Sequence, residues 1–539
     1  MPAGTLYREL CRKLEGRREE IKSRKRADWS RTRLSAKVTT GPKLIEIVRN
    51  PHAEGQFNHV KGLNSVHRRR CLTLTEAKSQ IHALGPTACT AHPKVLKNIA
   101  KQLDEHNIVS TQELQIARRM GIVATTPVAR PGFNDGIFFP YEHSTGGPAL
   151  EPVSPEAALA PVEPKKPKKR EMHAIALLVD FSDNKGARSA KDFEKLLFDK
   201  ANQNSMANFY RQLSYGALDV TGEVIDYVRA PQPYSYYTAT ESGTGSNYPQ
   251  NTPGLLNDVL MVFCQNDSLT RFDTDKDGLV DAIFLIHAGG GAEAEPNPAK
   301  RKNMIWSHKW TLPQPFVNQG VKVFAYSTQP EDGRVGVFSH EFGHLLGLPD
   351  LYDRTYRSHG IGDWCLMAGG SWGDQGNRPA RMSCWCLSKL GWIKPKVVLT
   401  RKKSLQLNTL EGKKTECYRL WTKGTIGPEY FLLENRQATG LDAALPGSGL
   451  AVWHIDERQS NNDDPLAYLV ALLQADGKKD LELLKNSGDD GDLFPGDKRV
   501  AALDDNTTPS TRSNMGSPSR VALTNIAMSG GIVTLRAEV

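Results

Sequence analysis

The sequence predicts an α/β part with a mixed sheet, followed by a β-rich part. Two unbroken apolar runs, at residues 174–181 and 282–288, suit buried central strands, and helical stretches lie between them. Residues 321–326 alternate between apolar and polar side chains, as an edge strand does. After about residue 396, short strand-like segments are separated by Gly, Asn and Asp, which is typical of β-rich structure.

Four regions follow from the composition of the 539-residue chain, whose 39% of hydrophobic residues can fill at least two cores. We predict a basic N-terminal region at 1–145, a Pro/Lys-rich linker at 146–170, a first folded part at 171–395 and the β-rich part at 396–539. The net charge of +9 is concentrated in N-terminal and linker runs. Aromatic residues are sparse there and no recognised motif occurs, which argues against nucleic-acid binding.

The apolar residues are too scattered for a membrane span, because no run reaches the roughly 18 residues that such a helix needs. The first 30 residues lack the apolar core of a standard secretory signal. The eight cysteines are dilute and form no CxxC pair, unlike a disulfide scaffold or a thiolate metal site. Nothing in the sequence indicates the oligomeric state.

The segment His-Glu-Phe-Gly-His at 340–344 predicts a zinc site on a helix. Residues four apart differ by only about 40° around a helix axis, so His340 and His344 face the same way and can both bind the metal. Glu341 lies about 100° from His340, where it can act as the general base on a zinc-bound water. The alternative interpretation is a buried helix with two hydrogen-bonded histidines and an ion-paired glutamate.

The third zinc ligand is expected just beyond this helix. Gly347 can adopt a positive φ and end the helix, and Pro349 cannot continue it, so the turned chain can carry Asp350 back to the metal. A carboxylate is a suitable zinc ligand. Asp353 also follows Gly347 and competes for the role, or orients a ligand through a hydrogen bond.

Met367, in a glycine-rich turn after Asp350, resembles the Met-turn beneath the zinc of metzincin peptidases. In this context the chain resembles the immune inhibitor A-type metallopeptidases. The resemblance rests on segments 177–183, 273–281, 305–310, 340–353, 449–456, 474–477 and 491–496, and covers roughly residues 171–539.

This resemblance implies a metzincin-like catalytic domain whose sheet has an edge strand that binds extended substrate. It implies a zinc-dependent endopeptidase acting on protein or peptide substrates, with His340, His344 and Asp350 as zinc ligands and Glu341 as base. It also implies secretion, while the lack of a signal sequence leaves an intracellular location open. The alternative is a catalytically silent binding protein that keeps the fold. Loss of the base or a ligand usually marks such proteins, and here all are present.

A second metal site is predicted at an acidic turn around Gly278, where carboxylates alternate along the chain. Oxygen ligands in this arrangement favour a structural Ca²⁺, and the candidates are Asp273, Asp275, Asp277 and Asp281. Phe284 stands at the twelfth position, where an EF-hand has Glu, so some ligands must come from elsewhere. An exposed acidic turn is the alternative.

The N-terminal region is interpreted as a pro-segment, with a processing sequence at 168–170. Cys89 suggests how such a segment inhibits, because a thiolate is a good fourth zinc ligand and would replace the catalytic water. The alternative is a buried or free cysteine in an N-terminal helical module.

Overall fold

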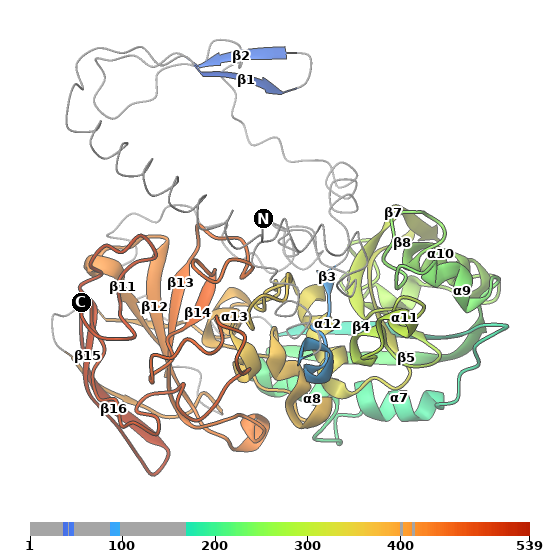
Figure 1. The fold of residues 1–539 in the computed structure, drawn as a ribbon. Coiled ribbons are helices and arrows are strands. Elements are labelled where there is room, and N and C mark those ends of the chain that lie inside the picture. Colours follow the sequence, from blue (N-terminus) through green and yellow to red (C-terminus); the bar gives the residue numbers. More distant parts are fainter. Residues whose placement is uncertain (1–35, 41–42, 48–86, 98–168, 399–402, 412–415) are drawn as a thin grey trace. The chain divides into compact units, whose positions relative to one another are not determined.

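The computed structural model describes residues 36–40, 43–47, 87–97, 169–398, 403–411 and 416–539 (Figure 1). The chain divides into two compact units, Met1–Leu72 and Thr73–Val539. In the first unit, strands β1 (Ala36–Thr40) and β2 (Lys43–Ile47) form an antiparallel hairpin. The predicted linker at 146–170 lies almost wholly outside the described residues. The other predicted boundaries remain predictions.

A mixed six-stranded sheet is the frame of the second unit (Figure 1). Its order is β3-β7-β8-β6-β4-β5, in which β5, β4, β6 and β8 are parallel and β7 is antiparallel to β8. The two apolar runs predicted as central strands are β4 and β6. The strands are β3 (Thr87–Ala88), β4 (Arg170–Asp180), β5 (Leu218–Arg229), β6 (Ile283–His287), β7 (His308–Asn318) and β8 (Val321–Pro330).

The prediction of an edge strand at 321–326 is wrong, because β8 lies between β7 and β6. The alternation has a local cause: β6 pairs only with the later part of β8, from Ser327 to Pro330. The earlier part pairs along its length with β7 alone, apart from one bridge to Leu279. One end of an interior strand therefore carries the pattern of an edge, and the edge strands of this sheet are β3 and β5.

Helices cover both faces of this sheet (Figure 1). Successive side chains of β4 point to opposite faces and pack against different helices. Ala174, Ala176 and Leu178 pack into one core with α7, α8 and α12, whereas Ile175 and Leu177 pack into another with α10. The helices are α7 (Ala190–Leu197), α8 (Met206–Leu213), α9 (Tyr234–Thr238), α10 (Thr252–Phe263), α11 (Pro298–Arg301), α12 (Val335–Leu345) and α13 (Cys384–Lys389).

Helix α12 approaches the 3-10 segment η5 (Gly369–Gly376) without room for a side chain between them. A Cβ added to Gly336 would lie 1.9 Å from the carbonyl oxygen of Ser371 and 3.1 Å from that of Gly376. Both obstacles are backbone atoms, which cannot rotate away.

We therefore expect Gly336→Ala to destabilise the protein by about 1–3 kcal/mol, the usual cost of overpacking. This cost exceeds the gain of about 1 kcal/mol in helix propensity that alanine brings. Urea unfolding measures the change. The control is Gly427→Ala, because a Cβ at Gly427 meets nothing closer than 3.9 Å. Equal stability of the two variants would contradict the close approach.

The chain after residue 395 is β-rich, as predicted (Figure 1). A five-stranded sheet has the order β14-β13-β12-β11-β9, and a three-stranded sheet has the order β10-β16-β15. Strands β12 and β13 are buried along their whole length and contribute to the core that contains α12. The strands are β9 (Lys396–Val397), β10 (Lys403–Leu407), β11 (Tyr418–Trp421), β12 (Glu429–Arg436), β13 (Gly449–Asp456), β14 (Val470–Leu472), β15 (Ala522–Ser529) and β16 (Ile532–Glu538).

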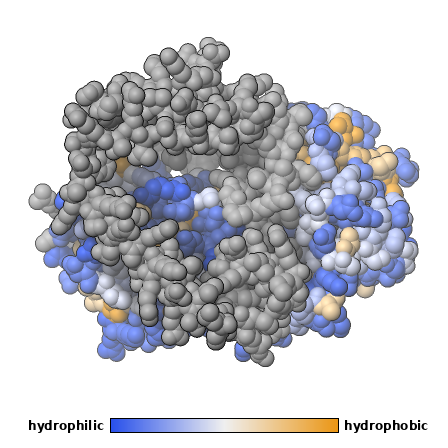
Figure 2. All heavy atoms as spheres, turned by 45° about the horizontal axis from the view of Figure 1, so that its top comes forward, coloured by the Kyte–Doolittle hydropathy of each residue, from blue (hydrophilic) through white to orange (hydrophobic). Residues whose placement is uncertain are grey.

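The described surface in Figure 2 is mostly hydrophilic, with apolar residues in small groups. Among the residues that the structure describes, no helix is both long and apolar enough to cross a membrane.

Candidate metal centre

Helix α12 places two histidines side by side in the interior. All its residues are buried, so its side chains are held by packing on every side. The rings of His340 and His344, one turn apart, have centroids 4.7 Å apart, and their Nε2 atoms are separated by 3.1 Å. This is the arrangement expected for two metal ligands on one helix face.

Asp350 completes a triangle of donor atoms. The helix ends at Leu345, and Gly347 then takes a φ of 95°, which reverses the chain. The Oδ1 atom of Asp350 lies 3.2 Å from the Nε2 atoms of both histidines. Zinc with bonds of about 2.0–2.1 Å in a tetrahedron separates its ligand atoms by about 3.3 Å. The triangle therefore fits zinc with little adjustment.

The protonation of these groups also fits a cation. The Nδ1 atoms of His340 and His344 lie 2.8 Å from the carbonyl oxygens of Leu366 and Leu348. A carbonyl only accepts hydrogen bonds, so each Nδ1 carries the proton and a neutral ring presents the Nε2 lone pair to the centre.

Electrostatics favour a neutral His340 and an ionised Asp350. Burial, the main cause, lowers the pKa of His340 and keeps it neutral. Burial opposes ionisation of Asp350, but His344 and His340 outweigh it and lower the pKa of this carboxyl to about 2. Three atoms that can bind a metal thus converge within 3.2 Å, an arrangement that a bound cation would stabilise.

Met367 lies under the helix, in the turn where the sequence indicates it. Its Sδ atom fills the space beside Gly343, only 2.5 Å from where a Cβ would stand. Its carbonyl accepts the amide of Leu351 at 2.8 Å, and the preceding carbonyl, of Leu366, orients His340. The turn therefore fixes both α12 and the chain that carries Asp350.

Glu341 is fully buried, and its carboxylate faces the same space as His340. One oxygen of Glu341, one ring nitrogen of His340 and the Sγ atom of Cys89 lie within 4.8 Å of one another. Burial, together with the carboxylates of Glu341 and Glu293, raises the pKa of the Cys89 thiol, so a thiolate there requires a cation beside it.

Asp353, the competitor of Asp350, is turned to its own loop. Its carboxylate accepts hydrogen bonds from the amide of Thr355 at 2.7 Å and the hydroxyl of Ser358 at 3.1 Å. Burial raises its pKa to about 6. Asp353 is outside the triangle of donors and stabilises the loop that follows it.

The acidic turn brings together three of its four predicted residues. Carboxylate oxygens of Asp273, Asp275 and Asp281 lie within 4.8 Å of one another. Asp277 instead accepts the amide of Leu279 at 2.8 Å, and burial raises its pKa to about 6.

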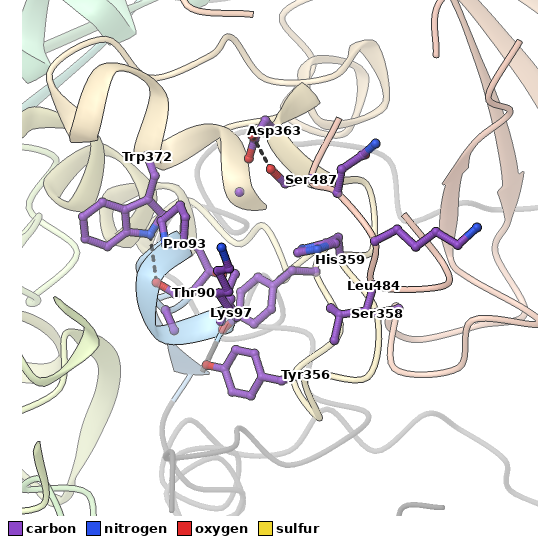
Figure 3. Close-up of a pocket in the computed structure, with 17 residues that line it drawn as sticks. Thr90, Pro93, Lys97, Tyr356, Ser358, His359, Asp363, Trp372, Leu484 and Ser487 are labelled. Carbon is purple, nitrogen blue, oxygen red and sulfur yellow. Dashed lines mark hydrogen bonds between the residues drawn. The ribbon is translucent and has the colours of Figure 1, made fainter. Parts of the chain in front are cut away.

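A cavity of about 300 Å³ lies between residues 90–97 and the loops at 352–372 and 484–487 (Figure 3). Thr90 and Pro93 form one wall, opposite His359 and Leu484. Residues 90–97, which belong to the N-terminal region, therefore form part of the cavity wall. Apart from Cys89, nothing in the local sequence predicts that this region contributes to the cavity.

Comparison with known proteins agrees with this geometry. Residues 161–393 match the family model described as Immune inhibitor A peptidase M6, catalytic domain. The chain is 32% identical over 253 residues to immune inhibitor A of Bacillus thuringiensis subsp. alesti, which covers 38% of the chain and 37% of that protein. It is 28% identical over 305 residues to the pre-pro-metalloprotease PrtV of Vibrio cholerae serotype O1, covering 46% of the chain and 32% of that protein.

The chain thus spans about a third of the length of these relatives. The matched region contains the sheet strands β4 to β8, helix α12, the three converging donors and Met367. Residues 161–393 are therefore similar to the catalytic domain of the immune inhibitor A peptidases of family M6.

Proposed function

We propose that the protein is a zinc-dependent endopeptidase that hydrolyses protein substrates. The observation that carries the proposal is the triangle of His340, His344 and Asp350, with donor atoms 3.1–3.2 Å apart and Glu341 facing the same space. His340, His344 and Asp350 would hold the zinc. When bound, Zn²⁺ acts as a Lewis acid toward the scissile carbonyl and lowers the pKa of water to about 7.

Glu341 is the proposed general base. Its buried carboxylate takes the proton of the attacking water and then passes it to the departing amine, so that the peptide bond breaks as the new carbon–oxygen bond forms. The hydrogen bonds from both histidine rings to backbone carbonyls keep the ligands fixed while the proton moves.

Strand β7 is the proposed binding strand for substrate. It pairs with β8 on one side and, on the other, only with the two residues of β3. The backbone groups of an edge strand can bind an extended peptide in any sequence, which suits a protein-degrading enzyme. The resemblance of the chain to its family supports an extracellular location for this activity.

The catalytically silent alternative is not favoured, because the base and all three proposed ligands are retained. Incubation of unfolded casein with the zinc-loaded protein tests the proposal. The Cys89→Ser variant is used, because the Cys89 thiol lies beside His340 and Glu341 and competes with water for the metal. We expect peptide fragments, and their disappearance when a zinc chelator is added. Intact casein, despite one zinc per chain, would favour the silent binding protein.

We further propose that the acidic turn binds a structural Ca²⁺ through Asp273, Asp275 and Asp281, with the remaining oxygens from backbone or water. At a hundredfold excess over its dissociation constant, calcium would stabilise the fold by about 2.7 kcal/mol. Thermal unfolding with and without CaCl₂ measures this increment.

We expect Asp273→Ala with Asp275→Ala to abolish the calcium increment, while zinc content stays the same. Asp277→Ala is the matched control, because its carboxylate is not among the three that lie within 4.8 Å of one another. If calcium leaves the melting curve of the parent protein unchanged, the turn is only acidic surface.

A further inference from the structure

We propose that residues 87–97 are a built-in inhibitor whose Cys89 thiolate is the fourth ligand of the catalytic zinc. The inference rests on the proposed zinc site and adds its regulation. The segment pairs with strand β7, side chains of the neighbouring elements hold its backbone, and the Cys89 sulfur lies beside His340.

The segment continues the sheet at the strand where substrate would bind. Thr87 pairs with Lys309 and Ala88 with His308, antiparallel to β7. The amide of Cys89 then donates to the carbonyl of Ser307 at 2.8 Å. The backbone groups at residues 307–309, which an extended peptide on β7 would use, are therefore already hydrogen-bonded to the segment.

Side chains around the cleft hold the backbone of the segment. Trp306 Nε1 donates to the carbonyl of Cys89 at 2.8 Å, and Trp372 Nε1 donates to that of Thr90 at 3.0 Å (Figure 3). The hydroxyl of Tyr352 donates to the carbonyl of Ala88. Each of these donors belongs to the catalytic part, so the segment is bound by the walls of the cleft.

Burial shows that the fit is close. Residues 88–91 are each at most 2% exposed, and Ala88, Ala91 and Val95 pack into the same core as α12. Past Ala91, the amide of His92 donates to the carbonyl of Glu293 at 2.9 Å. The imidazole ring of His92 packs edge-on against the ring of Trp372, with 4.8 Å between the ring centroids. A segment bound in this way excludes substrate as well as water.

The Cys89 sulfur lies beside one of the three proposed zinc ligands. It is within 4.8 Å of a ring nitrogen of His340 and of a carboxylate oxygen of Glu341, the proposed base. Two histidines and a carboxylate leave one corner of a tetrahedron open, and a thiolate is a strong ligand for it. As the zinc–sulfur bond forms, the thiol proton passes to solvent, and no oxidation or reduction is involved.

The thiolate and the water of the reaction compete for the same corner. While Cys89 holds it, Glu341 has no water to deprotonate, and the start of β7, at His308 and Lys309, is already paired with the segment. Withdrawal of the segment would also remove one wall of the cavity in Figure 3, so this space would join the open cleft.

Cobalt substitution tests the ligand directly, without relying on activity. In the full chain loaded with Co²⁺, we expect a near-ultraviolet sulfur-to-cobalt charge-transfer band. Cys89→Ser should lose the band and keep one cobalt per chain, because His340, His344 and Asp350 remain. Cys417→Ser, which alters another buried cysteine, should keep it. A parent protein without the band overturns the proposal.

Hydrolysis of unfolded casein by the zinc-loaded full chain tests the inhibition. If the segment closes the cleft in nine molecules of ten, complete release of the segment in Cys89→Ser should raise the rate about tenfold. Ala91→Arg, which cannot fit its buried position, should also raise the rate and should lose the band although Cys89 is present. Cys417→Ser should match the parent.

The outcomes separate this proposal from the proposed function. Equal, substantial activity of parent, Cys89→Ser and Ala91→Arg leaves the endopeptidase assignment intact and overturns the inhibitor. A cobalt band in the parent with no hydrolysis by any variant supports the thiolate ligand and sinks the endopeptidase assignment.

Discussion

Replacing Glu341 by glutamine or alanine is expected to lower casein hydrolysis by roughly 10²- to 10⁴-fold, the usual contribution of a general base. The side chain faces His340 from the same helix, and glutamine keeps its size while removing its basicity. The change is best made in the Cys89→Ser background, where the base is exposed to substrate. Zinc content should stay at one per chain, since Glu341 is not among the three converging donors.

The control for this variant is Glu457→Gln, which alters a half-buried carboxylate that accepts hydrogen bonds from Trp385 and Tyr430. It should hydrolyse casein at the rate of its background. Hydrolysis by Glu341→Gln at a comparable rate would end the assignment of the base. Low activity accompanied by loss of zinc would mean that Glu341 supports the site rather than the reaction.

Replacing Asp350 by alanine should weaken zinc binding by more than about 100-fold, beyond the 10- to 100-fold typical for residues that only orient ligands. The variant loses one of three converging atoms and leaves two neutral imidazoles. Competition with a chromogenic zinc chelator measures the affinity, and circular dichroism checks the fold.

Asp353→Ala is the matched comparison, because it removes a neighbouring buried carboxylate that lies outside the triangle. It should lose less affinity and should mainly destabilise the loop at 353–358. The opposite order of affinities would transfer the ligand role to Asp353.

Where the sequence was informative, a short-range physical rule linked residues to structure. The spacing of His340 and His344 fixes their relation through the pitch of one helix, and an unbroken apolar run such as 174–181 suits a strand buried on both faces. The preference for Asp350 over Asp353 came from the extended motif rather than from such a rule, because both residues follow Gly347. In the folded loop Asp350 lies beside His340, whereas Asp353 accepts hydrogen bonds from its own loop.

The missing pieces were long-range or backbone features. Cys89 and Trp306 are 217 residues apart, and no local pattern predicts their contact. The carbonyls of Leu366 and Leu348 orient both histidines, but any residue type supplies a carbonyl. Strand β8 looked like an edge because β6 is too short to cover its first half.

The attachment of the segment at 87–97 has a kinetic consequence. Its described contacts with the cleft are hydrogen bonds, packing and one proposed coordinate bond, so a cut in the chain between residues 97 and 169 leaves these contacts of residues 87–97 in place. Activation then becomes the dissociation of a two-piece complex. Dilution shifts it toward the active form, whereas a concentrated sample stays latent after complete cleavage. Activity should therefore rise with a lag set by the dissociation rate, and specific activity should fall as enzyme concentration rises.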